Sequence, residues 1–174
     1  MNTKYYVAYG SNLNFEQMKK RCPTAEYCGS GTLQDYALQF KGQNGGYFLT
    51  VSPERDQQTP VGIWKITARD EKALDFYEGY PSHYFKQQVP IDMDGQKITG
   101  MIYVMNPEMQ FGLPSAYYYQ VCRDGYKNCG LDVSALNKAL QESVTQYYEN
   151  SFQSNLQMCF SDDEELDYEE GMHL

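Results

Sequence analysis

The chain has 174 residues and a formal net charge of −9, from 14 basic and 23 acidic side chains. This length suits one domain, and the acidic excess argues against a broad nucleic-acid-binding surface, which needs a clustered basic face. The apolar stretch near the start is too short for a signal-peptide core, and no later run approaches the roughly 18 residues of a membrane span. We therefore expect a soluble, cytoplasmic protein that binds neither nucleic acid nor membranes.

The first part of the chain predicts strands with one short helix. A strand over residues 4–9 ends at a Gly-Ser-Asn sequence. Asn14 with Gln17 resembles a capping box for a helix over residues 15–22, which Pro23 stops. Further strands are expected over 25–40 (bent near Gly29), 47–52 and 61–66.

Stronger local signals follow. Thr67 or Asp70 can cap a helix over residues 69–77, and Gly79 stands where a C-cap glycine belongs. Asp94-Gly95 is a strong hairpin signal, and it joins expected strands over 84–91 and 97–105.

After Pro107 the pattern becomes helical. Pro114 fits the first position of a helix through about residue 128, closed by Gly130. Asp132 can cap a second helix, whose apolar stripe should pack on the sheet and consists of Val133, Leu136, Leu140, Val144 and Tyr147. Strands first and helices last predict an α+β fold: a compact mixed β-barrel with flanking short helices and C-terminal helices.

The acidic residues are concentrated at the end of the chain. Seven of the 23 lie within residues 161–170, which leaves residues 1–160 with a net charge of −2. Such a block usually stays solvated and unfolded. We therefore expect a domain over residues 1–150 and a mostly disordered acidic tail over 151–174, with no structure after 160.

The residue inventory restricts the chemistry. There are two histidines, His83 and His173, so any histidine-dependent catalytic device has to use His83. The five cysteines are odd in number and lack CxxC spacing, which favours free thiols in a reducing compartment over disulfides or zinc. The 17 tyrosines indicate many amphipathic positions, in the core or around a pocket.

The sequence YGSNL ends the first expected strand and consists of Tyr9, Gly10, Ser11, Asn12 and Leu13. A turn of this kind before a helix exposes consecutive backbone N–H groups, which can hold a carboxylate or a developing oxyanion. Glycine lets a ligand approach the main chain closely. An ordinary structural turn is the alternative.

Glu78 falls at the expected end of a helix, among aromatic residues that include Phe76, Tyr77, Tyr80 and Tyr84. The negative end of the helix and an apolar pocket both disfavour a carboxylate, so both raise its pKa. Glu78 then becomes a candidate for proton transfer near neutral pH. A solvated charge at a helix end is the alternative.

Three consecutive tyrosines, Tyr117, Tyr118 and Tyr119, form a third candidate. Consecutive residues on a helix point in different directions, so one hydroxyl at most reaches a pocket while the others pack elsewhere.

Together these motifs resemble the γ-glutamylcyclotransferase-like family. The resemblance spans about residues 4–140 and runs through YGSNL, Arg21-x-Pro23, LQDYALQF, VGIWKI with Trp64, Leu74-x-x-x-Glu78-Gly79, Tyr84, the Asp94-Gly95-Gln96-Lys97 hairpin, PSAYY, Gly125 and Gly130-Leu131. Asn12-Leu13 bring the chain closer to the γ-glutamylcyclotransferases proper than to relatives with a Tyr-Gly-Thr-Leu loop.

The resemblance implies a cavity at the YGSNL turn and an enzyme that cyclises the γ-glutamyl group of a small γ-glutamyl amino acid or amine to 5-oxoproline, releasing the amine. It implies Glu78 as general base and then acid, and substrate binding by Tyr9, Gly10, Ser11, Asn12, Leu13, Tyr84 and Tyr118. Arg21 is expected to be a structural ion-pair partner. We expect no metal or other cofactor and a monomer or homodimer. The alternative is a non-catalytic module that binds an amino acid or peptide.

Overall fold

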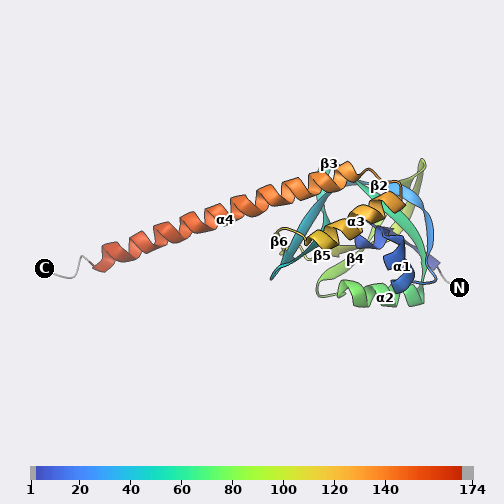
Figure 1. Ribbon diagram of the computed structural model, residues 1–174, viewed down its shortest axis with the longest axis horizontal. Coiled ribbons are helices and arrows are strands. Elements are labelled where there is room, and N and C mark those ends of the chain that lie inside the picture. Colours follow the sequence, from blue (N-terminus) through green and yellow to red (C-terminus); the bar gives the residue numbers. More distant parts are fainter. Residues whose placement is uncertain (1–2, 170–174) are drawn as a thin grey trace.

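A ring of paired strands forms the centre of the protein, in a computed structural model that describes residues 3–169 and the side chains of residues 3–158. Neighbours pair in the order β3-β1-β5-β4-β2, and β2 pairs again with β3, which closes a barrel (Figure 1). The five strands are β1 (Thr3–Ala8), β2 (Glu26–Gln43), β3 (Gly46–Thr67), β4 (Tyr84–Met93) and β5 (Gln96–Met105). β1 and β5 are parallel, whereas the other described pairs are antiparallel. The prediction of an α+β fold on a mixed barrel is confirmed.

β1 runs through the most buried part of the barrel. Val7 is in register with Ile63 on β3 and Ile102 on β5, and all three side chains are fully buried. The turn that follows β1 therefore starts from the core. Outside the ring, the short β6 (Gln110–Phe111) pairs with β2.

β2 and β3 form one long bent hairpin. In place of the single strand β3, the sequence predicted two shorter strands, over 47–52 and 61–66, with Pro53 and Pro60 in the segment between them. The ladder continues across both prolines by a register shift near residues 34–36. At this bulge Asp35 and Asp56 adopt left-handed backbone conformations, and the Asp35 carboxylate accepts a hydrogen bond from the Asp56 N–H at 3.0 Å. The bulge bends the hairpin without ending it.

Glycine is required where β4 closes the barrel against β2. A Cβ at Gly31 would lie 2.7 Å from the Asp92 carbonyl oxygen and 2.8 Å from a methyl group of Ile91. The adjacent pair Thr32 and Asp92 is the point where these two strands meet. The absence of a side chain at Gly31 therefore allows the ring to close.

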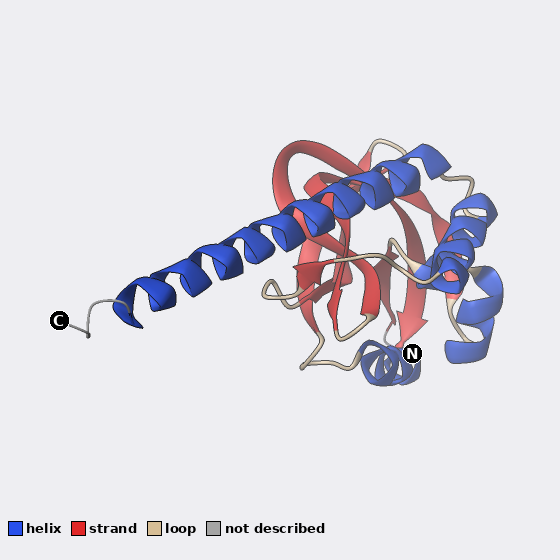
Figure 2. Ribbon diagram, turned by 60° about the vertical axis from the view of Figure 1, so that its left-hand side comes forward, coloured by secondary structure: helices blue, strands red, loops and turns tan. Residues whose placement is uncertain are grey.

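Short helices cover the outside of the barrel (Figure 2). They are η1 (Ser11–Leu13), α1 (Phe15–Arg21), α2 (Ala68–Glu78) and α3 (Ala116–Asn128). Asn14 caps α1 by accepting a hydrogen bond from the Gln17 N–H at 3.1 Å, as the sequence predicted. α3 begins after the cap residue Ser115, two residues later than the predicted Pro114 start.

α4 (Val133–Glu169) packs its first half on the barrel, as its apolar stripe predicted. Leu136 is fully buried, and the Ser143 hydroxyl accepts a hydrogen bond from the backbone N–H of Phe40 on β2 at 2.9 Å. Further along, Tyr147 meets Tyr47 edge to face.

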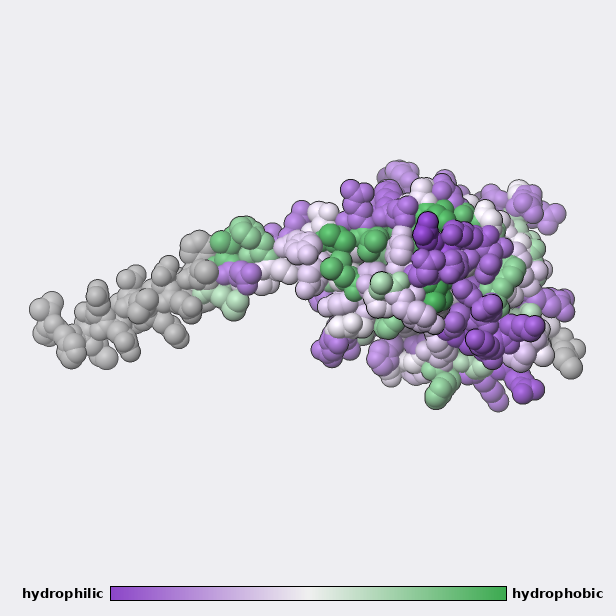
Figure 3. All heavy atoms as spheres, viewed as in Figure 1, coloured by the Kyte–Doolittle hydropathy of each residue, from purple (hydrophilic) through white to green (hydrophobic). Residues whose placement is uncertain are grey.

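Beyond Tyr147, α4 leaves the barrel and extends away from it (Figures 1 and 2). Exposed apolar side chains gather on this part of the helix, among them Phe152, Leu156 and Met158 (Figure 3). The sequence predicted no structure after residue 160, whereas the helix continues through Glu169. No Gly or Pro stands between Leu131 and Glu170 to end it. Residues 170–174 lie outside the described part, and a domain boundary at 150 stays a prediction, since α4 crosses it unbroken.

Candidate functional site

A cavity of about 390 Å³ opens between the turn after β1, the end of α2, the start of β3 and the start of α3. Buried residues such as Tyr6, Asn12 and Leu49 form its floor. Exposed aromatic residues, Phe48 and Phe76, stand at its rim. The cavity thus has a closed inner end and an open outer end, and it lies at the turn that the sequence singled out.

Four residues of the YGSNL turn line this cavity: Tyr9, Gly10, Ser11 and Asn12. The turn is held by hydrogen bonds from the Leu13 N–H to the Gly10 carbonyl at 2.9 Å and from the Asn14 N–H to the Ser11 carbonyl at 3.1 Å. The N–H groups of Ser11 and Asn12 come first in the helical turn and have no partner within it. They are the candidates for binding an anionic group.

Leu13 does not join them, and its predicted place in the binding site is corrected. Its side chain is fully buried and packs against two glycines. A Cβ at Gly62 would lie 2.6 Å from a Leu13 methyl group, and one at Gly125 would lie 2.8 Å from the Leu13 Cβ. Because the turn is helical, its successive side chains diverge, and Leu13 points into the core.

Gly10 lets the chain pass close to the cavity wall. A Cβ there would lie 3.2 Å from the Tyr118 hydroxyl and 3.4 Å from the Leu49 Cβ. A side chain at this position would push Tyr118 away or fill the inner end of the cavity.

α2 presents Glu78 at its last position. Thr67 and Asp70 form a capping box at the start of the helix, with the Asp70 carboxylate accepting from the Thr67 N–H at 2.9 Å. Gly79 ends the helix in the left-handed conformation, with φ of 63°. Both features confirm the sequence prediction.

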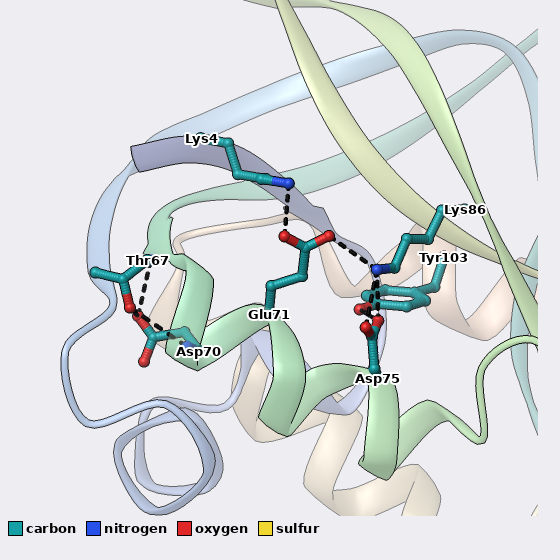
Figure 4. A network of polar contacts seen from close by, with 7 residues as sticks. All are labelled: Lys4, Thr67, Asp70, Glu71, Asp75, Lys86 and Tyr103. Atoms are coloured by element: carbon teal, nitrogen blue, oxygen red, sulfur yellow. Dashed lines mark hydrogen bonds and ion pairs between the residues drawn. The ribbon is translucent and has the colours of Figure 1, made fainter. Parts of the chain in front are cut away.

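An ionic network anchors α2 to three strands of the barrel (Figure 4). The Lys86 ammonium lies 2.8 Å from Glu71 and 2.7 Å from Asp75, and Lys4 lies 2.5 Å from Glu71. The Tyr103 hydroxyl donates to Asp75 at 2.5 Å. Burial alone would raise the pKa of Glu71, but hydrogen bonds from the two lysines hold it below its usual value. These charges are satisfied among themselves, which leaves Glu78 as the carboxylate that lines the cavity.

Burial raises the pKa of Glu78 to about 7, against the opposing effects of the Arg21 charge and a hydrogen bond from Asn12. Asn12 Nδ2 donates to Glu78 Oε1 at 2.8 Å. Near neutral pH this carboxyl group is therefore divided between its ionised and protonated forms, as a group that both accepts and returns a proton has to be.

Arg21 fixes the orientation of the Asn12 amide. Its Nη1 donates to Asn12 Oδ1 at 2.7 Å, which turns Nδ2 of Asn12 toward Glu78 and the Tyr6 hydroxyl. The guanidinium also lies 3.5 Å from the centre of the Tyr77 ring. Its hydrogen bonds go to the amide oxygens of Asn12 and Gln17 and not to a carboxylate, so the predicted ion pair is not formed by direct contact. Its charge acts on Glu78 from a distance instead.

Tyrosines from separate elements hold one backbone unit of the wall. The Tyr84 hydroxyl donates to the Leu49 carbonyl at 2.9 Å, and the Leu49 N–H donates to the Tyr118 hydroxyl at 3.1 Å. Tyr9 donates to the Tyr103 carbonyl at 2.6 Å. Burial raises the pKa values of Tyr9, Tyr84 and Tyr118 well above their usual value, so these hydroxyls stay protonated.

Among the three consecutive tyrosines, Tyr118 faces the cavity. Tyr117 is largely exposed, and the Tyr119 hydroxyl bonds to Asn137 on α4. This settles which of them reaches the pocket.

Sequence reasoning missed several cavity residues, namely Tyr6, Phe48, Leu49 and Tyr103. They come from β1, β3 and β5, and their place depends on how the strands close into a ring. Tyr6 alone carried a local signal, since its strand leads directly into the YGSNL turn. Tyr80, expected near Glu78, lies instead against Lys86.

Among the side chains that the structure describes, those of residues 3–158, no group of three or more His, Cys, Asp or Glu is placed to hold a metal ion. The four cysteines whose side chains are described, Cys22, Cys28, Cys122 and Cys129, are free thiols. None of the helices described combines the length and apolar character needed to span a membrane.

Comparison with known proteins agrees with the barrel fold. A solved structure called gamma-glutamyl cyclotransferase superposes with a TM-score of 0.73 and 26% sequence identity, covering 79% of this chain and 86% of the other. The gamma-glutamylcyclotransferases of Mus musculus and Bos taurus are each 30% identical, over 138 residues (74% of this chain, 73% of the relative) and 145 residues (76% and 75%). Residues 6–120 match the family model described as gamma-glutamyl cyclotransferase, AIG2-like. This chain therefore belongs to the gamma-glutamyl cyclotransferase, AIG2-like family.

Proposed function

We propose that this protein cyclises the γ-glutamyl group of a small γ-glutamyl compound to 5-oxoproline and releases an amine or amino acid. The observation that carries the proposal is Glu78, a carboxyl group with a pKa of about 7 that lines a cavity beside the YGSNL turn. A module that only binds an anionic ligand gains nothing from a carboxylate there, because the two charges repel.

Glu78 is the proton carrier in this proposal. The substrate α-amine, with a reference pKa of roughly 7.7–8, is mostly protonated at neutral pH. The Glu78 carboxylate takes a proton from it, and the nitrogen attacks the γ-carbonyl carbon to form a five-membered ring. Glu78 then returns the proton to the departing nitrogen as the bond between carbon and nitrogen breaks. The ring nitrogen still carries two hydrogens after its attack and gives one of them to the Glu78 carboxylate. Glu78 passes this second proton to the released amine, which leaves as an ammonium ion. Proton transfer of this kind contributes about 10²–10⁴-fold in rate.

The turn and the tyrosines position the substrate. The N–H groups of Ser11 and Asn12 bind the α-carboxylate or the tetrahedral oxyanion, and Tyr118 and Tyr84 hold the adjoining wall. The cavity floor bends the γ-glutamyl chain until the nitrogen and the carbonyl carbon meet. Near-attack geometry of this type removes on the order of 7 kcal/mol or more of barrier.

Incubation of the purified protein with γ-glutamyl amino acids and γ-glutamylamines tests the proposal. We expect mass spectrometry to detect 5-oxoproline and the free amine in equal amounts. Detection of bound ligand without any 5-oxoproline identifies a binding module instead.

A further inference from the structure

Phe76 presents an aromatic ring to water at the rim of the cavity. Phe76 is 91% exposed, and it lines the same cavity as Glu78, which lies two residues further along α2. A phenyl ring in this position gains nothing from burial in the protein itself. It offers apolar area to whatever enters the cavity.

A second aromatic side chain lines the cavity from β3. Phe48 is 44% exposed and lies edge to face against Tyr118, with ring centres 5.0 Å apart. Tyr77, also exposed at the rim, is held by the Arg21 guanidinium on its ring and by a contact of 3.1 Å between its hydroxyl and that of Ser11. We call Phe48, Phe76 and Tyr77 the aromatic rim.

The aromatic rim lies where the leaving group has to extend, a step that rests on the proposed function. The polar groups that suit the γ-glutamyl portion, Ser11 and Asn12, are buried at the inner end. Glu78 directly follows Tyr77 and returns its proton to the departing nitrogen. The part of the substrate beyond that nitrogen therefore extends outward to the aromatic rim.

The charges of the side chains that line the cavity also favour an apolar leaving group. Among the described residues that line the cavity, none is lysine or arginine. His83 lines the cavity, and the Arg21 guanidinium lies behind the Tyr77 ring, where it already donates hydrogen bonds to Asn12 and Gln17. A negatively charged side chain on the leaving group thus meets no lysine or arginine in the cavity lining, while an apolar one removes its own surface and that of the rim from water.

We propose that the aromatic rim selects substrates whose leaving amino acid carries an apolar, best an aromatic, side chain. Contact of a phenyl group with the rim is expected to raise kcat/KM about tenfold or more over a substrate without a side chain, in line with hydrophobic discrimination in other enzymes. Phe76 supplies the larger share, since it is the most exposed of the three residues.

The test compares kcat/KM for γ-glutamylphenylalanine, γ-glutamylglycine and γ-glutamylglutamate, which share the same α-carboxylate on the leaving group. We expect the phenylalanine compound to exceed the glycine compound about tenfold or more and the glutamate compound to be the poorest. In Phe76→Ser the preference for phenylalanine over glycine should fall to about twofold. Phe152→Ser, at an exposed phenylalanine on the projecting part of α4, is the matched control and should keep the full preference.

The outcomes separate the two proposals. Equal 5-oxoproline formation from all three compounds, or an unchanged preference in Phe76→Ser, overturns the role of the rim and leaves the cyclotransferase function standing. Absence of 5-oxoproline from every compound overturns the function, and the inference with it.

Discussion

The Asn12 side-chain amide donates a hydrogen bond to the Glu78 carboxylate at 2.8 Å, across 66 positions of the chain. It joins the turn after the first strand to the end of α2. Arg21 holds the other end of the same amide at 2.7 Å, so the orientation of Asn12 does not depend on Glu78 alone. The proposed base and the proposed anion-binding turn are thereby held at a fixed distance.

Replacement of Glu78 by glutamine should abolish turnover in a folded protein. Glutamine keeps the shape of the side chain and an oxygen that accepts the hydrogen bond from Asn12. Its amide group neither takes up nor releases a proton near neutral pH. We expect kcat for 5-oxoproline release to fall by about 10²–10⁴-fold. Glu54→Gln, at an exposed glutamate on β3, is the control. Wild-type turnover in purified Glu78→Gln would show that another group is the base.

The same variant should change how stability depends on pH. Burial raises the pKa of Glu78 from 4.5 to about 7, so between these values the folded state binds more protons than the unfolded state. The stability of the wild type is then lost as pH rises from about 4.5 through about 7. Glu78→Gln lacks this loss. The difference in free energy of unfolding between the variant and the wild type should therefore shift by about 3 kcal/mol in favour of the variant as pH rises from 4.5 to 8.

Urea unfolding of both proteins at half-unit steps of pH measures this difference. A constant difference across the range would contradict the raised pKa.

Two substitutions of Arg21 separate its charge from its geometry. Arg21→Met removes the positive charge that lowers the pKa of Glu78, so the rise of kcat/KM with pH should move to higher pH. Arg21→Lys keeps the charge but lacks the planar fork that binds both Asn12 and Gln17. It should lose activity with little change in the pH profile.

The pH profiles of kcat/KM for the two variants and the wild type decide this. Identical profiles in Arg21→Met and the wild type would mean that Arg21 does not act on Glu78.

Tyr118→Phe should affect both stability and substrate binding. The variant leaves the Leu49 N–H without its partner at a buried wall, at a cost of about 1–3 kcal/mol. KM for a γ-glutamyl substrate should rise as well, because the wall beside Gly10 loses its hydroxyl. Tyr117→Phe, at an exposed position, serves as the control and should match the wild type in both measurements.

Features that depend on neighbouring residues were predictable from the sequence. Thr67 with Asp70 marks the start of α2, Gly79 its end, and Asp94-Gly95 the β4–β5 turn, where both residues have positive φ. Each signal is a local backbone requirement, which a few residues express completely. The family resemblance predicted that Glu78 and the YGSNL turn share one cavity, because each of them is a short motif that can be recognised from a few consecutive residues.

Features that depend on chain closure were not predictable. Asn12 was expected to offer its backbone, and nothing near it in the sequence shows that its side chain reaches Glu78. Phe48 and Leu49 reach the cavity because the β2–β3 hairpin bends at a bulge, where the sequence predicted two separate strands over 47–52 and 61–66. The extent of α4 was not predicted because two signals in the sequence oppose each other. The run of acidic residues over 161–170 favours an unfolded tail, whereas the absence of Gly and Pro allows the helix to continue.

The projecting half of α4 makes the molecule far from spherical. A helix of 37 residues is about 55 Å long at 1.5 Å per residue, although only its first part rests on the barrel. Such a shape tumbles slowly about its short axes and scatters X-rays with an extended tail in its pair-distance distribution. A protein cut after Tyr147 should therefore lose far more in maximum dimension than in mass.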